Sequence, residues 1–257
     1  MTWALLHDRD NWLRSGQATI FFAPTHVPGF PPAALRDGVQ AVYFRAVSTA
    51  GGIITIRPTN AETLRYFSAH DLRIHGGVVL THATLRARAG EILHILREWT
   101  RDEIEDADWS FGWVGEVSNV TEVQFSISSQ TSSEWSLAEI VLGGDVVIGG
   151  ADGAPPPARH TVHSRTWNTV ENGPWRTKLA EPVSSFTLTF PPGREELLRS
   201  IYRRSEGGFR PVSFMPDTNG VAAYHGHLSD EHSISLGLGG VYEESQLVFT
   251  ESQRSVR

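Results

Sequence analysis

Apolar and polar residues alternate most clearly where the last third of the chain begins. Phe186, Leu188 and Phe190 alternate with threonines, and this two-residue period is typical of a half-buried strand. Pro191-Pro192-Gly193 then ends the strand, because proline cannot donate a hydrogen bond to a strand ladder. The pattern predicts a strand that stops at Phe190.

The apolar stripe that follows has the period of a helix. Leu197, Leu198 and Ile201 fall on one side of a helix, with glutamates before them and arginines after them, as the helix dipole favours. Gly207-Gly208 can cap its C-terminal end, and a second apolar strand follows. The segment therefore predicts strand, helix (residues 194–205) and strand, with the helix lying across a sheet.

Two further helices are expected in the first half. Residues 60–67 resemble a short helix capped by Thr59 or Asn60. Residues 91–99 carry Ile92, Ile95 and Trp99 at helical spacing. Strands are expected at residues 18–22, 39–47, 53–57, 109–114, 122–128 and 135–142, and two more within residues 74–85 on either side of Gly76-Gly77.

Glycine, alanine and three consecutive prolines at residues 149–159 mark the clearest domain boundary, because they favour an extended spacer. We therefore expect a mainly β protein of two β-sandwich domains, each with one short flanking α-helix. Residues 1–150 form the first, with an extended, proline-rich N-terminal segment that is either an arm on a neighbouring subunit or a surface loop. Residues 151–257 form the second. Residues 80–97 and 186–199 share a strand-then-helix pattern, which indicates either an internal duplication or a chance similarity.

Composition narrows the function. The 257 residues carry a net charge of −7, which argues against a sequence-independent DNA-binding surface. Without cysteine there are no disulfides, thiol nucleophiles or zinc–thiolate sites. We expect no membrane span and no secretory signal, since no long apolar run and no basic-then-apolar leader occur.

Three groups of residues are candidates for function. His225 and His227 fall on one strand and, with Asp230 or His232, are candidates for a metal site; the commoner alternative is a solvated strand face followed by a Ser-Asp turn. Trp167 and Trp175 are possible ligand-facing aromatics for a sugar, or simply buried side chains. An acidic run is either a solvated helix end or the negative lining of a DNA channel: Asp102, Glu103, Glu105, Asp106 and Asp108.

The second half resembles the distal tail or tail-tip proteins of long-tailed bacteriophages. The resemblance lies in five stretches in a fixed order: residues 167–177, 186–204, 207–217, 224–230 and 241–251. It implies a tail-tube-like β-sandwich with a flanking helix, repeated around a ring that is often six-fold. It also implies no enzymatic activity and no cofactor, and no nucleophile-elbow, phosphate-loop or zinc-protease motif occurs in the sequence.

The function expected from this resemblance is structural. The protein is expected in the virion, after assembly in the host bacterial cytoplasm, as a homo-oligomeric ring of a tail tip or baseplate. Its other partners would be the tube, hub and tip proteins, while DNA passes through without specific binding. The main alternative is a carbohydrate- or receptor-binding β-sandwich, and a metal-dependent hydrolase that uses His225 and His227 is a third hypothesis.

Overall fold

The computed structural model describes residues 2–22, 25–36, 43–48, 51–76, 79–130, 133–149, 158–161, 164–169, 173–178, 183–190, 194–236 and 242–252. The protein is mainly β, as expected, with its strands arranged in several sheets. Every strand pairing among the described residues is antiparallel.

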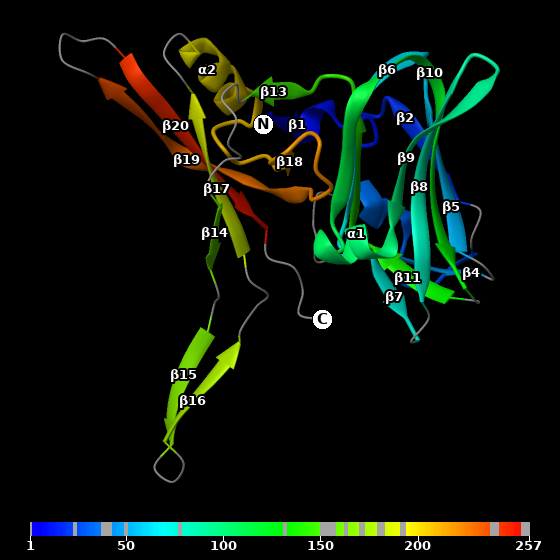
Figure 1. Ribbon diagram of the computed structural model, residues 1–257, viewed down its shortest axis with the longest axis horizontal. Coiled ribbons are helices and arrows are strands. Elements are labelled where there is room, and N and C mark those ends of the chain that lie inside the picture. Colours follow the sequence, from blue (N-terminus) through cyan, green and yellow to red (C-terminus); the bar gives the residue numbers. More distant parts are fainter. Residues whose placement is uncertain are drawn as a thin grey trace.

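One seven-stranded sheet, which we call the terminal sheet, combines strands from both ends of the chain (Figure 1). In spatial order its strands are β13 (Val147–Gly149), β1 (Trp3–His7), β18 (Val212–Met215), β19 (Tyr224–Leu236), β20 (Tyr242–Glu251), β17 (Val183–Phe190) and β14 (Ala158–Thr161).

Strand pairing does not follow a division at residue 150. β1 pairs with β18 on one side and with β13 on the other, so that Leu5 lies opposite both Phe214 and Val147. The chain thus leaves the terminal sheet after His7 and returns to it at Val147. Residues 8–146 form an insertion, which we call the inserted segment, between two neighbouring strands of that sheet.

The predicted strand that ends at Phe190, the helix at residues 194–205 and the strand after it are confirmed as β17, α2 and β18. α2 (Glu195–Arg204) lies across one face of the terminal sheet (Figure 1). Its buried Leu198 and Ile201 pack in one cluster with the sheet's aromatic residues. Gly207 and Gly208 both have positive φ, and the Gly207 N–H donates to the Tyr202 carbonyl at 3.0 Å, which closes the helix end.

The inserted segment builds two more sheets around the largest core of the protein (Figure 1). The first runs β12 (Glu139–Gly143), β6 (Glu62–His70), β10 (Phe111–Ser129), β5 (Gly51–Pro58) and β2 (Ala18–Phe22), and β10 also pairs with β8 (Leu80–Ala89), which pairs with β9 (Ile92–Thr100). The second runs β3 (Thr25–His26), β4 (Phe44–Ser48), β11 (Ser133–Leu137) and β7 (Arg73–His75). Three short helices accompany them: η1 (Asp8–Asp10), η2 (Pro32–Arg36) and α1 (Arg101–Asp106).

The helix expected at residues 60–67 is wrong, because this stretch enters β6. β6 pairs with β10 on one side and β12 on the other, and Leu64, Tyr66 and Phe67 are fully buried. Pairing on both edges satisfies the backbone of a central strand, which outweighs the local capping signal of Thr59 or Asn60.

The helix expected at residues 91–99 is also wrong, because this stretch is β9. Arg86 pairs with Ile95 but Leu85 pairs with Arg97, so Leu96 is an extra residue in a bulge. The bulge shifts the alternation by one residue and thereby imitates helical spacing. Ile92 and Ile95 are each 62% exposed on this edge strand.

The proposed repeat does not extend to these elements, since residues 80–97 form two strands whereas residues 186–199 form a strand and a helix. The N-terminal segment is not a free arm where it is described, because Ala34 and Leu35 are buried in the core of the inserted segment. Within the part of the chain that the structure describes, no helix is long and apolar enough to span a membrane.

Candidate functional site

The terminal sheet leaves a polar strip open on the face opposite α2. Phe186, Leu188 and Phe249 point into the core under α2. Their neighbours on β17 and β20 alternate to the other face and are partly or fully exposed: Ser185, Thr187, Gln246, Val248 and Thr250. This strip of mostly hydroxyl and amide side chains is available to another molecule.

A two-stranded hairpin extends from the terminal sheet. β15 (Ser164–Thr169) and β16 (Gly173–Lys178) pair only with each other among the described strands, and Figure 1 shows them reaching away from the rest of the protein. The register places Trp167 opposite Trp175. These two candidate positions therefore pair across the hairpin, which lies apart from the other sheets (Figure 1).

The acidic run forms α1 and the turn after it, instead of closing a preceding helix. Glu103 completes a capping box with Thr100, whose hydroxyl accepts from the Glu103 N–H. Glu103 and Glu105 also pair with Arg97 and Arg101 at 2.7 and 2.6 Å. Exposed carboxylates remain at Asp102, Asp106 and Asp108.

The two candidate metal-binding histidines have different surroundings. His225 is 1% exposed and its ring centroid lies 5.5 Å from that of His70, whereas His227 is exposed and its Nδ1 lies 3.3 Å from the Gly208 carbonyl oxygen. Among the described residues, no group of three His, Asp or Glu side chains can hold a metal ion. The side chains of Asp230 and His232 lie outside the described residues.

The ring of His225 packs against His70, which belongs to a buried polar network between the terminal sheet and the inserted segment. The Ser213 Oγ lies 2.8 Å from both the Tyr66 hydroxyl and the Ser68 Oγ, and 3.0 Å from His70 Nε2. A small apolar cluster surrounds these contacts: Ala4, Leu6, Tyr66, Val141, Met215 and Ala223. The network therefore fixes how the two parts pack, because a buried polar group left without its partner would be costly.

This network contains the residue types of a hydrolytic triad, but it has no access for a substrate. Ser68 and His70 are fully buried, and so is Glu139, which lies opposite His70 in the β6–β12 pairing. Burial also raises the pKa of the Tyr66 hydroxyl, which stays protonated and can donate. The sequence does not indicate this network, because the helix expected at residues 60–67 includes Tyr66 and stops before Ser68 and His70, and no strand is predicted there.

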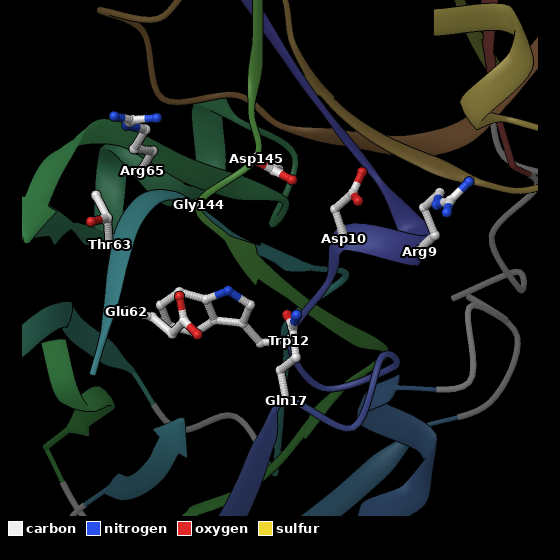
Figure 2. Close-up of a pocket in the computed structure, with 9 residues that line it drawn as sticks. All are labelled: Arg9, Asp10, Trp12, Gln17, Glu62, Thr63, Arg65, Gly144 and Asp145. Carbon is white, nitrogen blue, oxygen red and sulfur yellow. The ribbon is translucent and has the colours of Figure 1, made fainter. Parts of the chain in front are cut away.

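A polar cleft of about 270 Å³ opens where the chain crosses between the terminal sheet and the inserted segment (Figure 2). One wall comes from η1 and the residues after it, a second from the start of β6, and a third from the return crossing before β13. The lining residues are Arg9, Asp10, Trp12, Gln17, Glu62, Thr63, Arg65, Gly144 and Asp145.

Electrostatic contacts hold the cleft together. Arg204 on α2 reaches Asp10 at 2.7 Å and Asp145 at 3.5 Å, and so connects both crossings to the terminal sheet. Arg65 pairs with Glu116 at 3.1 Å. No motif in the sequence marks this cleft, since its three walls are far apart along the chain.

The comparisons with known proteins identify no family. No protein-family model matches the sequence, and no curated protein matches it significantly. A GH29 fucosidase of Ruminococcus gnavus in complex with fucose is similar in structure at 12% identity, with a TM-score of 0.41 over 53% of this chain. This chain covers only 27% of the length of that fucosidase.

Two smaller structures are similar over about half of this chain. A family 32 carbohydrate-binding module of Clostridium perfringens, in complex with GalNAc-β-1,3-galactose, shares 14% identity and a TM-score of 0.40 over 51% of this chain and 99% of its own. The family 32 module of C. perfringens NanJ, in complex with galactose, shares 10% identity and a TM-score of 0.40 over 55% and 98%. With scores this low, these likenesses carry no argument about the site or the function.

Proposed function

We propose that the protein is a structural component of a bacteriophage tail, in the distal tail, tail tip or baseplate, which assembles as a ring around the DNA channel. In this proposal it is not an enzyme, it needs no cofactor, and its partners are copies of itself, most simply six, together with the tube, hub and tip proteins. It acts in the virion after assembly in the host cytoplasm.

The observation that carries this proposal is the hairpin β15–β16 on an open sheet. A lone two-stranded hairpin is marginally stable in water, and a surface on a second molecule would stabilise it. Among the described strands, the terminal sheet also ends in two short edge strands, β13 and β14, each paired on one side only. A hairpin from one copy that lies on the next makes a head-to-tail contact, and such contacts give a ring where the rotation between neighbouring copies closes.

The mass in solution tests assembly directly. We expect light scattering to give a closed oligomer and negative-stain images to show a ring with a central hole. Replacing residues 164–178 with a short Gly-Ser linker should leave the melting temperature of the protein nearly unchanged and reduce its mass to that of a monomer. A ring that persists in this variant contradicts the role of the hairpin, and a monomeric parent protein favours the binding-module alternative.

The acidic run is proposed to line the channel, since negative charge repels phosphate and lets DNA slide without adhesion. The variant that tests this is Asp102→Lys with Asp106→Lys. It spares Glu103 and Glu105, whose cap and ion pairs stabilise α1.

Rings should still form in this double variant, and DNA should leave virions that carry it several-fold more slowly. The comparison is with virions of the parent protein, assayed at the same salt concentration. An unchanged rate of DNA ejection contradicts the channel-lining role of these carboxylates.

A second candidate function is a carbohydrate- or receptor-binding module. The insertion of residues 8–146 between β1 and β13 favours it, because the segment contains its own large core and can be displayed on a structural sheet. In this alternative Trp167 and Trp175 are contacts for the ligand. A glycan screen on the whole protein tests the idea, with sugar-dependent quenching of tryptophan fluorescence as the readout.

A further inference from the structure

The polar cleft at the two crossings has the features of a preformed binding site. Asn11 accepts from the Leu142 N–H at 3.4 Å and donates to the Ile140 carbonyl at 3.2 Å, and the Trp12 N–H donates to the Leu142 carbonyl at 2.9 Å. These bonds tie the outgoing crossing to β12. Together with the bonds from Arg204, they hold the walls in place without a ligand, which lowers the entropic cost of binding.

Two glycines allow the walls to approach this closely. A Cβ on Gly144 would lie 2.3 Å from the Thr63 carbonyl oxygen, and one on Gly143 would lie 2.6 Å from that of Asp10. Backbone therefore faces backbone at these points, and no flexible side chain could move aside. The shape of the cleft is a property of the main chain.

The charges of the cleft select for a neutral ligand. Asp10 and Asp145 share Arg204, and Arg65 is paired with Glu116. Among the described residues, Arg9 and Glu62 are the lining charges without an ion pair, and they are of opposite sign. A net anion or cation would therefore gain little from this surface, and one of the two free charges would repel it.

Hydroxyl groups suit this surface, since each one can both donate and accept. Glu62 offers acceptors, Arg9 offers donors and Gln17 offers both. Figure 2 shows the indole of Trp12 between Glu62 and Gln17, although Trp12 itself is only 3% exposed. A volume of about 270 Å³ is slightly below the usual range of small-molecule pockets, about 300–1,000 Å³, and fits one or two sugar rings.

We propose that this cleft binds a neutral saccharide of one or two rings, held by hydrogen bonds to Glu62, Gln17 and Arg9. The inference rests on the second candidate function, a binding role for the inserted segment, and does not depend on ring assembly. Because the contacts are few and exposed to water, a dissociation constant on the order of 1 mM is expected.

The experiment is a ligand-observed NMR titration of the full-length protein with glucose, galactose, mannose, N-acetylglucosamine and rhamnose, one at a time. At least one of these sugars should bind. Glu62→Ala and Gln17→Ala should each weaken that binding at least fivefold, while Glu98→Ala, which removes an exposed carboxylate from β9, should leave it unchanged. Circular dichroism spectra establish that the variants are folded.

Three results would overturn the proposal. The first is that none of the five sugars binds. The second is that the bound sugar keeps its affinity in both cleft variants, which places binding elsewhere and leaves a general binding role intact. The third is that glucuronate or glucosamine binds as tightly as its neutral counterpart, because the cleft would then not select for neutral ligands.

Discussion

Replacing Leu198 with aspartate is expected to unfold the terminal sheet. Leu198 lies on the side of α2 that faces the sheet and is fully buried, in one cluster with Phe186, Phe214 and Phe249. A carboxylate at this position has no described partner and loses its hydration, which costs on the order of 4 kcal/mol, a large part of the stability of a typical domain. Because β1 and β13 belong to the same sheet, the two crossings to the inserted segment should loosen as well.

Urea unfolding followed by circular dichroism measures this effect. Ser200→Asp is the matched control, since it introduces the same side chain on the exposed face of the same helix. The free energy of unfolding of the control should lie within about 0.5 kcal/mol of that of the parent protein, as it does for most surface substitutions. If Leu198→Asp unfolds at the same urea concentration as Ser200→Asp, α2 is not packed on the sheet.

Acidification is expected to produce the second large effect, through two buried histidines. Burial lowers the pKa of His7 and of His225 to about 3, and nearby positive charge reinforces this: Arg204 and Arg9 at His7, and His227 and Arg14 at His225. Both rings stay neutral in the folded protein, whereas in the unfolded chain they take up protons below pH 6.5.

Stability is therefore fully present above pH 6.5 and falls as the pH drops towards 3. The expected loss is about 1.4 kcal/mol per pH unit for each histidine. Burial raises the pKa of Asp8 despite Arg14, so that at the acid end Asp8 acts in the opposite direction and offsets part of the loss. Because His225 lies at the junction with the inserted segment, the two parts should separate early in acid.

The measurement is the free energy of unfolding in urea at pH 7, 6, 5 and 4. His225→Gln should reduce the slope against pH by about half, whatever its effect at pH 7. Equal slopes in the parent protein and in His225→Gln would show that His225 is not held neutral by burial.

Local sequence patterns predicted secondary structure and burial correctly where an element packs against the core with one face only. Leu198 and Ile201 share a helical stripe, and the neighbouring strand alternates between apolar and hydroxyl residues, so each predicted its own burial correctly. Residues 18–22 and 53–57 were likewise predicted as strands and form β2 and β5. The sequence also singled out Trp167 and Trp175 on the hairpin and the acidic run at residues 102–108. Their proposed roles in ligand binding and channel lining remain predictions.

Local sequence patterns predicted the wrong secondary structure where a strand contains a bulge or is buried on both faces. In β9 the extra residue Leu96 disturbs the alternation, and in β6 polar Ser68 and His70 are as buried as their apolar neighbours. Neither situation can be read from the stretch itself, because the deciding partners lie on β8, β10, β12 and β18.

The sequence alone predicted the mainly β class, the strand that ends at Phe190 with the helix at residues 194–205 and the strand after it, and the absence of thiol chemistry. These follow from local periodicity and composition. The tertiary structure was needed to show that β1 lies between β13 and β18 in the terminal sheet, that residues 8–146 are an insertion, and that Ser213 meets Ser68 and His70 across a buried junction. The polar cleft, too, could be found only from the structure, because its walls come from distant parts of the chain. The physical reason is that strand pairing and charge pairing join residues more than a hundred positions apart, and single-sequence periodicity carries no information on which distant strands meet.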